Sequence, residues 1–153
     1  MKKWIAAFRL KTLPLALSNT IMGSALAAGE DKFRWSIFGL AALTTILLQI
    51  MSNMANDYGD FVNGKDTAER IGPKRMVQSG EITPKTMLRG IIIIGIFTAI
   101  SGLTLILVGT AGIDITNILI FGVLGIAAIV AAIKYTVGKN PYGYRGLGDI
   151  FAF

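Results

Sequence analysis

Residues 53–75 read NMANDYGDFVNGKDTAERIGPKR and form a strongly polar stretch at the end of a long apolar run. If the helix of the apolar run continues into this stretch, four side chains at positions i, i+3, i+4 and i+7 share one face: Asn53, Asn56, Asp57 and Asp60. Carboxylate and amide oxygens suit a hard cation such as Mg²⁺, which completes its shell with water and substrate phosphates. The stretch therefore predicts a magnesium site at the mouth of a membrane helix. Gly59 and Gly64 are expected to loosen the helix, so that Asp66 can fold back to the same site.

Basic residues follow this acidic face within the same loop. Arg70, Lys74 and Arg75 come 10 to 15 residues after Asp60. Carboxylates that hold a metal beside bases that hold phosphate are the groups that a diphosphate-processing site needs. Two simpler interpretations stay open, because Asn and Asp also cap helix ends and because cytoplasmic loops of membrane proteins collect bases for topology alone. A cap typically uses one such residue, so four on one face favour the metal site.

Composition places the chain among membrane proteins. Of its 153 residues, 53% are apolar, and the chain has neither cysteine nor histidine. A disulfide scaffold and a thiolate zinc site are therefore excluded, and any catalysis has to use carboxylates, amides, Tyr, Lys and Arg. The net charge of +6 does not indicate nucleic-acid binding, since the bases stand in blocks between apolar segments.

The apolar segments predict an all-α, multi-pass transmembrane helical bundle of about four spans and the start of a fifth. The four spans are expected at 13–28, 35–52, 87–108 and 115–133. A short interfacial helix at 1–11 precedes them; the N-terminal residues also fit a signal peptide, and that alternative leaves the later spans unchanged. Helix packing is the expected role of two sets of residues within the spans: Thr98, Ser101 and Thr104, and Gly122, Gly125 and Ala128.

Charge bias orients these spans. Of the 15 Lys and Arg residues, only two fall in the loop 29–34, and the others stand on the opposite side of the predicted membrane. The positive-inside rule therefore predicts that the N-terminus and the acidic loop lie in the cytoplasm. We expect the protein in the inner cell membrane. The loop after the fourth span, which carries Lys134 and Arg145, lies on that same side. Its Tyr142 and Tyr144 also fit an interfacial aromatic belt.

The chain ends at Phe153, a few residues into another apolar segment. A stub of that length cannot cross a bilayer, which needs about 20 residues. We therefore expect residues 1–153 to be a single membrane domain that forms the N-terminal half of a longer protein, with the missing C-terminal half as a partner.

The motifs resemble those of the UbiA superfamily of intramembrane prenyltransferases. The run Asn-Asp-Tyr-x-Asp at 56–60, the Gly-x-Asp at 64–66 and the later GPKRMVQSG at 72–80 are similar to the family's first aspartate-rich motif and the segment after it. FRLKTLP at 8–14 and YGYRGLGDIFAF at 142–153 resemble the entries to the family's first and fifth helices. The version here looks most like the branch that prenylates 1,4-dihydroxy-2-naphthoate in menaquinone biosynthesis.

The resemblance implies roles for individual residues. Asn56 and Asp60 take the first two positions of the family's N-x-x-x-D-x-x-x-D pattern, and the third position is Gly64, with the acid displaced to Asp66. The implied Mg²⁺ ligands are Asn53, Asn56, Asp57, Asp60 and Asp66, the implied diphosphate-binding bases are Arg70, Lys74, Arg75 and Arg145, and the catalytic candidates are Asp57, Asp60 and Lys134. The Tyr-x-x-x-Lys element of some members is not reproduced, since no Tyr stands four residues before Lys134.

The implied activity is Mg²⁺-dependent transfer of a polyprenyl group from polyprenyl diphosphate to 1,4-dihydroxy-2-naphthoate. The acceptor's electron-rich ring would attack the allylic cation that forms as the C–O bond breaks. Alternatives are another UbiA-type aromatic prenyltransferase, a CDP-alcohol phosphotransferase, whose Asp-Gly-x-x-Ala-Arg run is not found, and a non-enzymatic cation transporter subunit, which would need acids at the membrane centre. The family's second aspartate-rich motif lies beyond this chain's end, so the chain alone is expected to bind Mg²⁺-diphosphate weakly and to be inactive.

Overall fold

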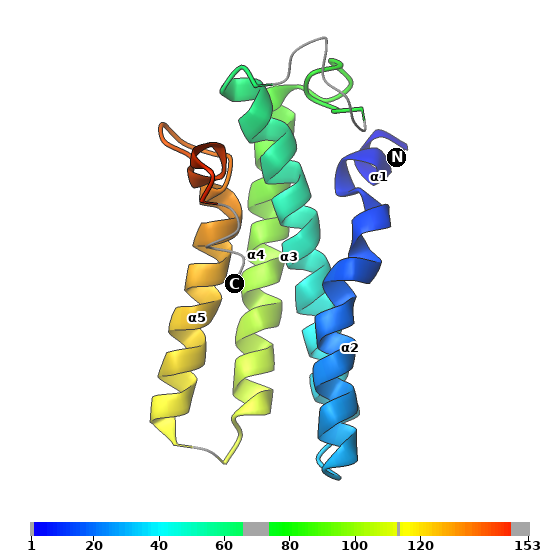
Figure 1. Ribbon diagram of the computed structural model, residues 1–153, viewed down its shortest axis with the longest axis vertical. Coiled ribbons are helices and arrows are strands. Elements are labelled where there is room, and N and C mark those ends of the chain that lie inside the picture. Colours follow the sequence, from blue (N-terminus) through cyan, green and yellow to red (C-terminus); the bar gives the residue numbers. More distant parts are fainter. Residues whose placement is uncertain (1, 66–73, 113, 148–153) are drawn as a thin grey trace.

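The computed structural model is a bundle of long helices that run up and down beside one another (Figure 1). The structure describes residues 2–65, 74–112 and 114–147, and these ranges contain no strand. The helices are α1 (Lys2–Phe8), η1 (Leu10–Thr12), α2 (Leu13–Gly29), α3 (Trp35–Val62), α4 (Pro84–Gly109), α5 (Ile115–Lys134) and η2 (Tyr142–Arg145). The predicted all-α fold is confirmed.

Three of the described helices are long and apolar enough to cross a membrane: α3, α4 and α5. α2, with 17 residues, is shorter. Large apolar side chains stand exposed along α4 and α5, among them Phe97, Leu107 and Phe121. Helices that satisfy their own backbone groups and expose apolar side chains are what a bilayer accommodates. The protein is therefore a membrane protein.

Helices α3 and α4 form the centre of the bundle, with α2 packed on α3 and α5 packed on both (Figure 1). Ser101 on α4 pairs with Thr44 on α3 through their hydroxyl groups, 2.8 Å apart. Thr98, also on α4, is buried and donates to a carbonyl of its own helix. The predicted packing role is confirmed for Ser101 and Thr98. Thr104 is exposed and donates to the Ile100 carbonyl of its own helix, so its packing role stays a prediction.

The small residues of α5 leave space beside α4. Gly122, Gly125 and Ala128 line an apolar cavity of about 240 Å³ between α3, α4 and α5. A Cβ built at Gly122 would have no neighbour within 4 Å, and one built at Gly125 would meet only the Ile106 side chain, at 3.9 Å. The expected close approach of α5 to a neighbour is therefore wrong at these positions, because the missing side chains open a cavity instead.

The buried core lies at one end of the bundle, where α1, the C-terminal half of α3, the segment 75–82 and the start of α4 meet (Figure 1). It consists of Ala7, Ile50, Met51, Met54, Ala55, Met76, Val77, Ile82, Met87 and Ile91. Methionine is flexible enough to fill the irregular gaps between a helix and a loop. The polar stretch of α3 reaches this same end, so its side chains are set among well-packed neighbours.

Helix α3 continues into the polar stretch, past Asp60, and ends within it at Val62. The helix is unbroken at Gly59, so the prediction that Gly59 loosens it is wrong. The end is a Schellman motif, in which the Gly64 N–H donates to the Phe61 carbonyl at 3.1 Å and the Lys65 N–H donates to the Asp60 carbonyl at 2.8 Å. Gly64 has φ = 64°, the left-handed conformation that this motif requires and that glycine adopts without strain.

Candidate functional site

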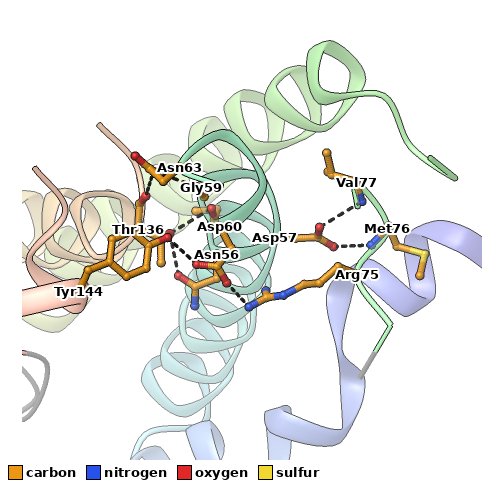
Figure 2. Close-up of polar contacts among 11 residues, drawn as sticks. Asn56, Asp57, Gly59, Asp60, Asn63, Arg75, Met76, Val77, Thr136 and Tyr144 are labelled. Atoms are coloured by element: carbon orange, nitrogen blue, oxygen red, sulfur yellow. Dashed lines mark hydrogen bonds and ion pairs between the residues drawn. The ribbon is translucent and has the colours of Figure 1, made fainter. Parts of the chain in front are cut away.

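The four polar side chains of α3 divide into two pairs that face different neighbours, and Figure 2 shows three of them, Asn56, Asp57 and Asp60. Positions i, i+3, i+4 and i+7 cover an arc of about 100° on a helix, so the two edges of the arc can meet different elements. Asn53 and Asp57 face α1 and the segment 75–82, whereas Asn56 and Asp60 face the end of α5 and the segment that follows it. The four side chains that the sequence places on one face of the helix therefore contact two different parts of the protein.

Asn53 fastens the N-terminal elements to α3. Its side-chain amide donates to the Phe8 carbonyl and to the Thr12 hydroxyl, both at 2.9 Å, and the residue is 5% exposed. The chain turns between α1 and η1 at Arg9, whose φ of 51° interrupts the helix. The Phe8 carbonyl at this break needs a partner in a water-poor setting, and Asn53 provides it. Asn53 was predicted as a metal ligand, whereas in the structure its side-chain amide is turned toward α1.

Asp57 holds the segment that follows the polar stretch. Its carboxylate accepts the backbone N–H groups of Met76 at 2.8 Å and Val77 at 3.1 Å, and the residue is 1% exposed (Figure 2). Two consecutive amides satisfy a buried carboxylate well, since hydrogen bonds to a charged group are the strong ones. Asp57 was predicted as a metal ligand and a catalytic residue, but here it faces away from Asn56 and acts as an anchor for residues 75–77.

Asp60 lies between two partners from different parts of the chain. One carboxylate oxygen forms an ion pair and hydrogen bond with Arg75, and the other accepts the Tyr144 hydroxyl at 2.6 Å (Figure 2). The side chains of Arg75 and Asp60 are 7% and 13% exposed. The structure thus brings together a predicted metal ligand and a predicted phosphate-binding base. Each carboxylate oxygen has two lone pairs, so these contacts leave Asp60 the capacity to bind a cation.

Asn56 is held from the end of α5. The Thr136 hydroxyl is 2.9 Å from Asn56 Oδ1 and 3.1 Å from the Ala55 carbonyl. The Thr136 carbonyl in turn accepts the Asn63 side-chain amide at 2.9 Å (Figure 2). Thr136 can come this close because residue 59 is glycine: a Cβ there would lie 2.5 Å from the Thr136 carbonyl oxygen.

The remaining predicted bases are distributed around this site. Lys74 is exposed and forms a salt bridge with Glu81 at 3.0 Å. Lys134 and Arg145 are also exposed, and they lie on α5 and η2. Two predicted site residues, Asp66 and Arg70, lie outside the residues that the structure describes.

The described donors fit a Mg²⁺ ion that is completed by its substrate. Asn56 and Asp60 are one helical turn apart and offer an amide oxygen and a carboxylate, which are ligands that Mg²⁺ accepts. No group of three Asp, Glu, His or Cys side chains gathers within the described residues. That is compatible with Mg²⁺, which usually binds one or two carboxylates and takes its other ligands from water and phosphates.

Sequence reasoning missed Thr136 and the role of Gly59. No local pattern marks Thr136, since a threonine after a helix has no special meaning until its partners on α3 are known. Gly59 lies within the quoted motif, but its spacing says nothing of the segment that packs on it. An interfacial belt was one interpretation of Tyr144 from the sequence, and its contact with Asp60 was not expected: the Tyr144 hydroxyl donates to the Asp60 carboxylate at 2.6 Å.

Comparison with known proteins adds independent evidence. The sequence profile described as the UbiA prenyltransferase family matches residues 16–153. A 1,4-dihydroxy-2-naphthoate octaprenyltransferase of Haemophilus influenzae is 50% identical over 152 residues, which cover 98% of this chain and 49% of the relative. The Escherichia coli protein of the same name is 48% identical over 96% of this chain and 47% of its own length. A UbiA prenyltransferase domain-containing protein of Dictyostelium discoideum is 29% identical over 97% of this chain and 44% of its own.

The chain spans about half the length of the curated relatives that it matches. No solved structure shows a significant match to it.

Proposed function

This chain belongs to the UbiA prenyltransferase family, and we propose that it supplies a metal–diphosphate site for the transfer of a polyprenyl group to 1,4-dihydroxy-2-naphthoate. The names of its relatives support the reaction and the acceptor. The asymmetry of its Lys and Arg residues supports a place in the inner membrane with this site on the cytoplasmic side. This chain corresponds to about half the length of these relatives. The complete activity is therefore proposed for a protein that contains this half and the other half of the relatives' length.

One observation carries the proposal: Arg75 pairs with Asp60, one helical turn from Asn56, at the core end of the bundle. Asn56 and Asp60 would hold Mg²⁺ through their side-chain oxygens. A bound Mg²⁺ ion would neutralise the negative charge that develops on the diphosphate leaving group. Arg75, already beside Asp60, would donate to the diphosphate oxygens, for which its planar guanidinium is well suited.

Other groups would assist this core. Lys74 is exposed at the edge of the site, where its ammonium group can attract an anionic substrate from solution. The apolar cavity between α3, α4 and α5 would give the prenyl chain surroundings similar to lipid. Apolar surroundings also keep water away from the allylic cation, which water would otherwise consume.

The proposal is tested by binding of a radiolabelled polyprenyl diphosphate to the 153-residue chain in detergent, with and without Mg²⁺. Asp60→Asn alone would break the buried ion pair between Asp60 and Arg75, which costs roughly 3–5 kcal/mol. The test therefore also uses the double variant Asp60→Asn/Arg75→Gln, in which neither charge remains, and circular dichroism to check its fold. Asp114→Asn, an exposed helix cap at the start of α5, is the matched control.

We expect Mg²⁺-dependent binding by the unchanged chain and by the Asp114→Asn control. The folded double variant should lose that dependence. Binding that ignores Mg²⁺, or a double variant that binds like the unchanged chain, would contradict the proposal.

A further inference from the structure

We propose that Thr136 is a positioning residue for the metal site: its hydroxyl fixes the side chain of Asn56 so that the amide oxygen can bind Mg²⁺. This inference rests on the proposed function, since it concerns a ligand of the same site. The observation behind it is the 2.9 Å contact between the Thr136 hydroxyl and Asn56 Oδ1, on the side of α3 that also carries Asp60 (Figure 2).

An asparagine needs such a partner because its amide group can turn. Rotation about the last side-chain bond exchanges the oxygen, which binds cations, for the NH₂ group, which repels them. The Thr136 hydroxyl has one hydrogen and two acceptors within reach, Asn56 Oδ1 at 2.9 Å and the Ala55 carbonyl at 3.1 Å. Donation to the nearer acceptor, Oδ1, specifies which end of the Asn56 amide faces the end of α5. The oxygen has a second lone pair, and that lone pair stays available to a metal.

Thr136 itself is held by contacts that do not depend on its side chain. Its carbonyl accepts the Asn63 amide at 2.9 Å, and its backbone lies against Gly59. The residue is 2% exposed, so water cannot easily replace its hydroxyl as the donor to Asn56. The position of the hydroxyl is therefore set by the fold, as required of a group that orients another one. Outer-shell partners of this kind typically change metal affinity by about 10–100-fold when removed.

The test compares two substitutions at this position. Thr136→Val keeps the branched shape and removes the donor, whereas Thr136→Ser keeps the hydroxyl. Thr110→Val is the matched control, because Thr110 is also buried, at 5% exposed, but donates to the Ile106 carbonyl of α4, the helix that it caps, at 2.6 Å. The affinity for Mn²⁺, a Mg²⁺ substitute with an electron paramagnetic resonance signal, is measured in the presence of a polyprenyl diphosphate. Thermal unfolding of the metal-free variants is recorded alongside.

We expect Thr136→Val to weaken Mn²⁺ binding about tenfold or more, while Thr136→Ser and Thr110→Val stay within about twofold of the unchanged chain, well below that outer-shell effect. If Thr136→Val binds Mn²⁺ as tightly as the unchanged chain, the inference is overturned and the proposed function stands. The same holds if Thr136→Ser loses as much affinity for Mn²⁺ as Thr136→Val. If the unchanged chain binds no Mn²⁺ with the diphosphate present, the proposed function fails and the inference fails with it.

Discussion

Replacing Gly59 by alanine tests whether the segment after α5 packs against α3 as the structure describes. The added Cβ would lie 2.5 Å from the Thr136 carbonyl oxygen, 2.7 Å from its carbonyl carbon and 2.7 Å from its Oγ1. Two of these atoms belong to the backbone, so a side-chain rotation cannot relieve the contact. Either α3 and the segment move apart or the hydrogen bonds of Thr136 to Asn63 and Asn56 are lost.

The size of the effect follows from two opposing contributions. Forcing one extra carbon into a packed contact costs about 1–3 kcal/mol. Losing a hydrogen bond costs about 1 kcal/mol, so losing both bonds of Thr136, to Asn63 and to Asn56, would cost about 2 kcal/mol, which lies within the same range. Alanine in place of glycine within a helix returns about 0.5–1 kcal/mol. We therefore expect Gly59→Ala to lower the free energy of unfolding by about 1–2 kcal/mol.

Gly39→Ala isolates the contact from the change in helix propensity. Gly39 lies on the same helix, and a Cβ built there has no neighbour within 4 Å. Both variants gain the same propensity, so the difference between them measures the contact alone. The assay is unfolding in a denaturing detergent, followed by circular dichroism, with hydrogen exchange to locate the change. If the two variants unfold at the same detergent concentration, the seating of Thr136 on Gly59 is refuted.

Three further changes test other contacts. Asp57→Asn should cost about 1.5–3 kcal/mol, because a charged acceptor is lost, and hydrogen exchange at the amides of residues 76–77 should accelerate; unchanged protection would contradict the anchor. Ser101→Ala should cost about 0.6 kcal/mol, the mean for an interhelical hydrogen bond in a membrane, and Thr104→Ala on the same helix nothing measurable; equal losses would contradict the pairing across helices. Burial, and then the charge of the neighbouring Tyr135, raise the pKa of Tyr142 above 10.0. The folded state therefore holds this proton more tightly than the unfolded chain does. The free energy of unfolding should keep its full value below pH 10 and fall as the pH rises through the raised pKa. Tyr142→Phe should remove from an absorbance titration one tyrosine step that lies above the usual pH for tyrosine, and a titration without that change would refute the assignment.

The fold was predictable because it depends on local properties of the sequence. Runs of apolar residues long enough to span a bilayer, separated by charged or glycine-containing loops, define α3, α4 and α5 without knowledge of their neighbours. The end of α3 was less accessible. Gly64 signals a helix end by its type, but the same residue type at Gly59 lies inside the helix, and only the approach of Thr136 explains the second glycine.

The candidate site was predictable as a region and not as a set of contacts. Helical spacing places Asn53, Asn56, Asp57 and Asp60 on one arc, and the arc was correct. The partners of these residues come from 45 residues earlier, at Phe8, and from 80 and 84 residues later, at Thr136 and Tyr144. Periodicity within one helix carries no information about such distant segments, so it cannot say which edge of the arc meets which neighbour.

Arg75 connects the two edges of the arc, and this explains why the polar stretch contains more acids and amides than a metal needs. The backbone that follows Arg75 is fixed by the Asp57 carboxylate, on one side of α3, while its guanidinium group pairs with Asp60. A long side chain reaches a defined place only if its backbone is held, because an arginine loses up to about 2 kcal/mol of conformational freedom when it is ordered. Asp57 thus bears on the charge balance at Asp60 without touching it. One acid anchors the loop and the other is the proposed metal ligand, which is a division of roles that residue type and spacing alone could not reveal.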